Sequence, residues 1–317
     1  MAYLVDILTL AAILAIATQG YMLIKGLGGM LHLGHAVFYG IGAYAAAITS
    51  TKLPPAGSFP LSVLIGGTAG MLGGFLIGWP ALRNRGRYFM IVTFAVQIIF
   101  VTFVINLHVT GGPDGISSIP GISLFAWRPD HTLRIGLGAF TFGYAHVKLA
   151  VIVTLAALSF FICRQLIGSS YGRLVRAVRD DELAVEAYGR EALAVKASIL
   201  MAGAAVTGVA GALFAHHFNY VGPTQFELDA TILFLIMLIV GGQYSLVGAT
   251  LGAVLMVLLL EALRFLLDNV LSVPFDMTAH LRQVVFAVIL VVALAWRGSG
   301  LVGERFATFA PPHRPPA

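Results

Sequence analysis

The chain has few of the residues that stabilise a soluble protein or hold a nucleotide. Charged side chains make up 10% of its 317 residues, against about 25% in an average soluble domain. Its single cysteine, Cys163, excludes a disulfide within the chain. No glycine-rich loop ends in Gly-Lys-Ser or Gly-Lys-Thr, which excludes a self-contained P-loop ATPase. These absences argue against an enzyme.

Apolar residues are abundant instead, at 59% of the chain. They gather in stretches near the ~20 residues that a helix needs to cross a bilayer, without the alternation typical of a membrane barrel. The sequence therefore predicts an all-α, polytopic transmembrane helical bundle with about eight or nine membrane segments. These segments are expected at 4–24, 31–50, 61–80, 88–108, 145–163, 196–216, 230–241, 246–267 and 281–296.

Two of these segments are open to a second interpretation. Segment 230–241 is short for a full crossing and ends in a pair of glycines, and segment 31–50 is rich in glycine. Both are either full crossings or broken, re-entrant helices, which membranes tolerate where irregular backbone is enclosed by protein.

Positive charge sets the expected orientation, because cytoplasmic loops of membrane proteins are rich in lysine and arginine. Counting crossings places the basic clusters on one side, which we assign to the cytoplasm; they comprise Lys25, Arg83, Arg85, Arg87, the arginines of segment 164–195, Arg297, Arg305 and Arg314. The N-terminus and the loop 109–144 are then outside. Residues 1–300 form the membrane domain, and the proline-rich tail 301–317 is expected to be a disordered cytoplasmic extension. The same loops account for the net charge of +5 without nucleic-acid binding.

Glycines recur at every fourth residue of the third predicted span, so they share one helix face. They are Gly66, Gly70, Gly74 and Gly78. Such a face lets a neighbouring helix backbone approach closely. The pattern predicts tight helix packing, and the sharper alternative is that these helices slide during transport.

Polar and small residues inside the spans are the candidates for a solute pathway. We single out Gly34, His35, Phe38, Thr93, Gln97 and Asn106. The alternative for the polar members is simple hydrogen bonding between helices. His32 and His35 lie three residues apart without acidic or cysteine companions, so no metal site is predicted.

One charged segment, 164–195, interrupts the apolar chain and predicts two short amphipathic helices. The residues expected to dock a cytoplasmic partner are Gly172, Arg173, Arg176, Arg179, Asp180, Asp181, Glu182, Glu186 and Gly189. The alternative is a solvated loop held by its own salt bridges.

Four segments carry a resemblance to a known family. They are 28–44, which contains Leu-Gly-His-Ala and Gly-Ile-Gly-Ala-Tyr, then 82–93, 110–116 and 172–189. Through them nearly the whole chain resembles the permease subunits of branched-chain amino acid ABC transporters, the LivM type.

The resemblance implies partners and a cargo. A second permease subunit, identical or different, would complete the membrane core. Two cytoplasmic ATPases would bind the ATP and magnesium, so this chain would hold no cofactor, and segment 164–195 would dock to them. An extracytoplasmic binding protein would deliver solute near loop residues Thr110, Gly111, Gly112, Asp114 and Gly115. The expected cargo is a branched-chain amino acid crossing the bacterial inner membrane; urea, short amides or aromatic acids are alternatives, as is an ion-coupled transporter or channel.

Overall fold

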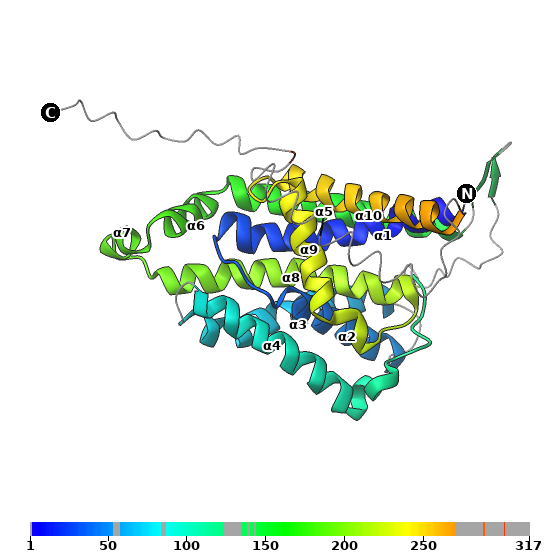
Figure 1. Cartoon of the computed structure of the whole chain (residues 1–317), viewed down its shortest axis with the longest axis horizontal. Coiled ribbons are helices and arrows are strands. Elements are labelled where there is room, and N and C mark those ends of the chain that lie inside the picture. The colour runs from blue at the N-terminus through cyan, green and yellow to red at the C-terminus, as the bar shows by residue number, and fades with distance from the viewer. Residues whose placement is uncertain are drawn as a thin grey trace.

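The computed structural model describes residues 2–52, 58–83, 87–122, 135–137, 140–142, 144–269, 288 and 301. Within them the chain is a bundle of helices, most of which run along one common direction (Figure 1). The helices are α1 Ala2–Tyr21, continued by the π-helix η1 Met22–Leu27, then α2 His35–Lys52, α3 Ser58–Leu82, α4 Arg87–Asn106, α5 Tyr144–Gly168, α6 Ser170–Asp180, α7 Glu182–Ala187, α8 Ala192–Phe218, α9 Leu228–Gly241 and α10 Leu246–Asn269.

The connections contain short elements. Three 3-10 turns, η2 His108–Thr110, η3 Gly112–Asp114 and η4 Pro223–Phe226, lie between the longer helices. Strands β1 Ile135–Leu137 and β2 Phe140–Phe142 pair antiparallel, with Ile135 opposite Phe142. This small hairpin is an addition to the predicted all-α fold.

Six of the described helices are long and apolar enough to cross a membrane, which confirms a polytopic helical bundle. They are Tyr3–Leu27, Phe59–Leu82, Tyr88–Asn106, Tyr144–Gly168, Ala192–Phe218 and Leu246–Leu266. The first prediction, 4–24, falls short of the observed end because the helix continues through η1. The predicted span 281–296, apart from residue 288, and most of the tail lie outside the described residues.

The helices differ in how deeply they are buried. In the span Tyr3–Leu27, formed by α1 and η1, 83% of the most apolar 18-residue stretch is buried inside the protein. The corresponding share is 22% for α4 and 11% for α5. Helix α1 is therefore the centre of the bundle, and α5 lies at its rim, where apolar side chains face outward.

Glycines bring helices α2, α3 and α8 into backbone contact. A Cβ added to Gly70 would lie 2.5 Å from the carbonyl oxygen of Ala204, and one added to Gly42 would lie 2.2 Å from that of Gly208. All four glycines of the predicted α3 face meet α8: Gly66 lies against Ala212, Gly70 and Gly74 against Ala204, and Gly78 against Leu200. No larger residue allows this approach.

The second predicted segment is broken. After η1 the chain folds back along α1, so that the Tyr21 hydroxyl donates to the His32 carbonyl and His35 Nε2 lies 3.0 Å from the Ala17 carbonyl. Leu27 follows Ala17 by ten residues, about 15 Å along a helix. Helix α2 therefore begins deep inside the bundle.

The region after α8 is built in the same way. Residues 219–227 lead back into the protein, where Phe226 is fully buried, before α9 starts at Leu228. Helix α9 has only 14 residues and crosses the direction of α1 and α8 (Figure 1). Both α1–α3 and α8–α10 thus have the order long helix, irregular segment, shorter helix, long helix, with 18 residues in α2 and 14 in α9.

Candidate functional site

The N-terminal turns of α2 and α9 meet at a shared junction. The Ala36 amide at the start of α2 donates to Thr231 Oγ1 in the first turn of α9, at 3.0 Å. The Thr231 hydroxyl in turn donates to Gln97 Oε1 at 3.4 Å. The first amides of a helix have no partner within it, so a buried helix start needs such an acceptor.

Helix α4 supplies side chains for both irregular segments. The amide group of Gln97 donates to the Phe226 carbonyl in the segment before α9. One turn earlier, Thr93 Oγ1 accepts from the Leu33 amide at 3.1 Å in the segment before α2. A Cβ on Gly34 would lie 2.9 Å from the Thr93 carbonyl oxygen, so Gly34 allows this close contact. These bonds satisfy backbone groups that would otherwise be buried without water.

Two buried histidines continue the junction towards α1 and α8. His32 Nε2 lies 3.3 Å from His35 Nδ1, and His35 Nε2 lies 3.2 Å from Thr207 Oγ1. The Thr207 hydroxyl donates to the Gly203 carbonyl, which leaves its oxygen free to accept from His35. Tyr21 stacks on the His35 ring with centroids 4.3 Å apart. Donation from Nε2 of each ring fits these contacts, whereas a hydrogen bond at the 3.4 Å contact between His32 Nδ1 and the Met30 carbonyl oxygen requires a proton on Nδ1.

The structure brings five of the six pathway candidates together at the junction. Gly34, His35, Phe38, Thr93 and Gln97 are all buried there. Asn106 lies apart, exposed at the far end of α4, and donates to the Thr102 carbonyl of its own helix. The contacts of Thr93 and Gln97 are hydrogen bonds between segments, and a role in solute passage stays a prediction.

The charged segment forms two short helices, as its sequence pattern predicts. Ser169 caps α6 by accepting from the Gly172 amide, and Asp181 caps α7 by accepting from the Ala184 amide at 3.0 Å. A Cβ on Gly172 would lie 2.4 Å from the Leu166 carbonyl oxygen, so the turn from α5 to α6 requires glycine. Gly189 ends the segment in the left-handed region, with φ of 77°. In Figure 1, α6 and α7 lie at the end of the bundle opposite the N-terminus.

Side chains of α8 hold this segment in place. The Tyr171 hydroxyl bonds Ser198, and Lys196 forms an ion pair with Glu182. Val175 and Val178 of α6 are buried against the rest of the protein. The segment is therefore packed against the bundle instead of extending freely from it.

The predicted docking residues separate into two groups. Arg173, Asp180, Asp181, Glu186 and Gly189 are exposed, whereas Arg176, Arg179 and Glu182 are half-buried and Gly172 is buried. In the contacts described, Arg173 donates hydrogen bonds only to nearby residues of the chain, Ser170 and Gly168. Arg179 instead reaches back to the bundle, where Nη1 donates to the Gly26 carbonyl at 3.0 Å.

Two apolar residues of this segment were missing from the predicted docking set. The side chains of Leu183 and Tyr188 are 68% and 89% exposed, beside exposed Ala184 and Ala187. Their position among charged residues was the signal that could have identified them. If these apolar side chains faced lipid, the neighbouring carboxylates would have to lie in the lipid as well.

The start of this segment also contains a sequence motif that is typical of hydrolases. Residues 168–172 read Gly-Ser-Ser-Tyr-Gly, the spacing of a hydrolase nucleophile, which requires a turn between a strand and a helix. Here Ser170 opens α6 directly after helix α5 and bonds Arg173. The strand-to-helix turn that exposes such a nucleophile is therefore not formed at this place.

At the other end of the bundle, the predicted loop residues form a compact turn. Gly111, Gly112 and Gly115 have positive φ, and Thr110 Oγ1 donates to the Val104 carbonyl at the end of α4. A Cβ on Gly115 would lie 2.2 Å from the Val221 carbonyl oxygen, and Ile116 pairs with Val221. The turn is thereby joined to the irregular segment that leads to α9. Asp114 is exposed.

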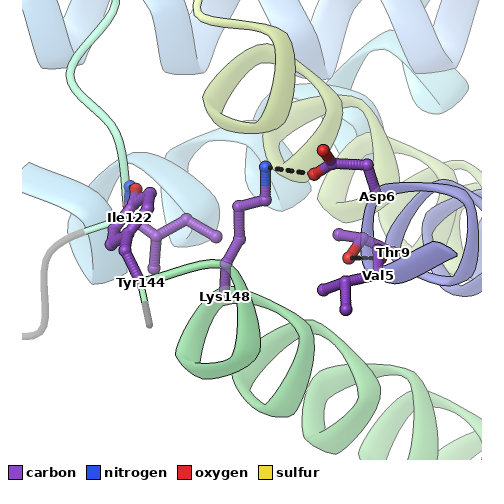
Figure 2. Close-up of polar contacts among 6 residues, drawn as sticks. All are labelled: Val5, Asp6, Thr9, Ile122, Tyr144 and Lys148. Atoms are coloured by element: carbon purple, nitrogen blue, oxygen red, sulfur yellow. Dashed lines mark hydrogen bonds and ion pairs between the residues drawn. The ribbon is translucent and has the colours of Figure 1, made fainter. Parts of the chain in front are cut away.

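The same end carries an ion pair that attaches the rim helix α5 to α1. Lys148 of α5 reaches Asp6 of α1 at 3.2 Å, and the Tyr144 hydroxyl accepts from the Ile122 amide (Figure 2). Residues 123–134 lie outside the described part of the chain. In the part that is described, no group of three or more His, Cys, Asp or Glu is placed to hold a metal ion.

Comparison with known proteins identifies the family. A family model described as "branched-chain amino acid transport system / permease component" matches residues 3–294. LivM of the high-affinity branched-chain amino acid transport system of Escherichia coli K12 is 32% identical over 310 residues, covering 94% of this chain and 69% of LivM. A probable LivM of Methanocaldococcus jannaschii is 25% identical, covering 90% and 79% of the two chains.

LivH of E. coli is 24% identical over 307 residues, covering 93% of each chain. No solved structure matches this chain. The bundle of apolar helices and these matches together show that the protein is a multi-pass membrane protein belonging to the branched-chain amino acid transport system permease family.

Proposed function

We propose that the chain is one of two permease subunits of an ATP-driven importer for branched-chain amino acids in the bacterial inner membrane. Its relatives are named as permease proteins of such systems, which supports the cargo. ATP and magnesium would be bound by cytoplasmic ATPase subunits, and an extracytoplasmic binding protein would deliver solute beside the turn at 110–116. The end of the bundle that carries α6 and α7 faces the cytoplasm, as does the C-terminus.

The observation that carries the proposal is the exposed apolar tip of α7. Leu183 of α7 and Tyr188 directly after it are exposed, as are Asp181 directly before α7 and Glu186 within it. Carboxylates do not enter the hydrocarbon region without a large cost in free energy, so this tip lies outside the bilayer. Apolar and aromatic side chains with a charged rim are typical of the energetic centre of a protein interface. We assign this tip to the ATPase.

The central junction supports a cargo without net charge. Its polar side chains are an amide, hydroxyls and imidazoles, contributed by Gln97, Thr93, Thr231, His32 and His35. An amino acid that carries one positive and one negative group needs no permanent counter-charge in such a region. The side chain of a branched-chain amino acid adds only apolar surface.

The test is to change the tip and measure assembly with the ATPase subunits encoded for the same system. The double variant Leu183→Asp with Tyr188→Asp removes both apolar anchors, so ATPase recovered with the purified permease is expected to fall by about ten-fold or more. Tyr188→Phe is the matched control and keeps the apolar ring. An unchanged melting temperature shows that the bundle remains folded. Full recovery of ATPase with the double variant would rule out this surface.

A second measurement separates the importer from an ion-coupled transporter. Leucine uptake into proteoliposomes is expected only when the ATPase subunits, the binding protein and internal ATP are all present. Uptake by the purified chain alone, driven by an ion gradient, contradicts the proposal.

A further inference from the structure

We propose that Arg179 is a positioning residue that transmits movement of α6 and α7 to the irregular segment before α2. Through this segment the movement reaches the junction of α2 and α9. The proposal rests on the proposed function, because it assumes that the ATPase moves α7. It differs from the sequence prediction, which placed Arg179 on the docking surface.

The guanidinium of Arg179 joins three segments of the chain. Nη1 donates to the Gly26 carbonyl of η1 at 3.0 Å, and Nε donates to Asp180 of α6 at 3.0 Å. The guanidinium carbon also lies 5.4 Å from the centre of the Tyr244 ring, in the turn between α9 and α10. This distance is typical of a cation–π contact. One side chain thus contacts the ends of two segments that lead to the junction.

The bond to Gly26 has a local physical reason. The last carbonyls of a helix have no amide partner within it, and they carry the negative end of the helix dipole. A cation at this position satisfies the carbonyl and is favoured by the dipole. Arg179 therefore caps the Gly26 carbonyl from α6, while the amides of Gly28, Gly29 and Met30 cap other carbonyls of η1 from within the same segment.

The alkyl part of Arg179 makes the second contact with this region. Gly29 has φ of 71°, and a Cβ built on it would lie 2.5 Å from Arg179 Cγ. The side chain of Arg179 therefore lies directly on the backbone of Gly29. Displacement of α6 must move this backbone or break the contact. His32 follows Gly29 by three residues, and the start of α2 at His35 follows by six.

The surroundings leave room for such movement. A cleft of about 520 Å³ lies among Arg179, Asp180, Gly29, Tyr244 and the pair formed by Lys25 and Gln243. Lys25 of η1 bonds Gln243, so η1 contacts the α9–α10 turn independently of Arg179. Charged contacts beside an open cleft exchange with water at little cost, in contrast to those at the buried junction.

Arg173 provides the matched comparison. It carries the same charge on the same helix, two turns earlier, but its described bonds go to Ser170 and Gly168. A merely electrostatic role for α6 in docking would make the two arginines equivalent. A transmitting role makes them different.

The experiment compares Arg179→Gln, Arg179→Lys and Arg173→Gln in the complete transporter in proteoliposomes. Co-purified ATPase, basal ATP hydrolysis, stimulation of hydrolysis by leucine-loaded binding protein, and leucine imported per ATP are measured. We expect Arg179→Gln to keep the ATPase and the basal rate but to lower import per ATP by about ten-fold, within the range typical of coupling between sites. Arg179→Lys keeps the charge and is expected to restore part of it, whereas Arg173→Gln, at a predicted docking position, is expected to change the amount of co-purified ATPase and not the import per ATP.

The outcomes separate this inference from the proposed function. Normal import per ATP in Arg179→Gln overturns the inference, and so does loss of the co-purified ATPase, which would return Arg179 to the docking surface. Both results leave the proposed function intact, since that depends on Leu183 and Tyr188. If Arg179→Gln does not fold, Arg179→Met keeps the alkyl part that lies on Gly29 but removes the bond to the Gly26 carbonyl. Its normal stimulation and import would likewise overturn the inference.

Discussion

The middle of the bundle and the end that carries α6 and α7 both contain polar contacts, but these contacts are stabilised differently. At the junction the bonds join neutral groups that are fully buried, and glycines bring neighbouring backbones into contact. At the end that carries α6, the charged side chains of Arg179 and Lys196 make half-exposed contacts, and those of Arg179 lie beside an open cleft. A buried polar group that loses its partner is costly, whereas an exposed ion pair contributes little. The comparison indicates that contacts at the end with α6 break more easily than contacts at the centre.

The largest expected effect comes from separating helices at the centre. Gly70→Leu would place side-chain atoms against the backbone of α8, since even a Cβ lies 2.5 Å from the Ala204 carbonyl oxygen. We expect the free energy of unfolding to fall by about 3 kcal/mol or more. The yield of monodisperse protein and its melting temperature in detergent measure this. Gly168→Leu is the control, because a Cβ there meets nothing within 4 Å. Equal effects at the two sites would contradict the comparison.

A smaller loss is expected when the junction loses one side chain. Gln97→Leu keeps the size of the residue but leaves the Phe226 carbonyl and the Thr231 hydroxyl without their α4 partner. The expected destabilisation is about 1–3 kcal/mol, measured by thermal or denaturant unfolding. Thr102→Val on the exposed part of α4 removes only a bond within its own helix and is expected to have little effect. A Gln97 variant as stable as the parent would show that these groups find other partners.

The smallest effect is expected at the end that carries α6 and α7. Lys196 and Glu182 form an ion pair whose side chains are 19% and 40% exposed. Glu182→Gln should therefore change the free energy of unfolding by less than about 1 kcal/mol, and less still at high salt. Unfolding at low and high ionic strength provides the measurement. A loss comparable to that of Gln97→Leu would mean that this end is as rigid as the centre.

Local patterns in the sequence predicted the features that depend on near neighbours. Apolar length identified the long helices, the four-residue spacing of Gly66 to Gly78 identified a packing face, and glycine and charge placed α6 and α7. The alternative of broken segments at 31–50 and 230–241 followed from length and glycine content. Each of these depends on residues within about one helix of one another.

Features that depend on distant segments were not predicted. The junction joins Thr93 to Leu33 and Gln97 to Phe226, and nothing near these residues in the sequence identifies their partners. The direction of Arg179 depends on where η1 ends in space, and the exposure of Leu183 and Tyr188 depends on how α7 is turned. In a chain this apolar, residue type alone does not distinguish a leucine exposed to water from a leucine that faces lipid.

Cys163 lies in α5 with only 1% of its surface exposed. A thiol enclosed in this way reacts slowly with polar maleimides, and the chain has no other. A cysteine introduced at exposed Ala177 of α6, outside the proposed docking tip, would therefore be the dominant site of modification in the otherwise native chain. Fluorophores or spin labels placed there would follow α6 during ATP turnover with little background signal.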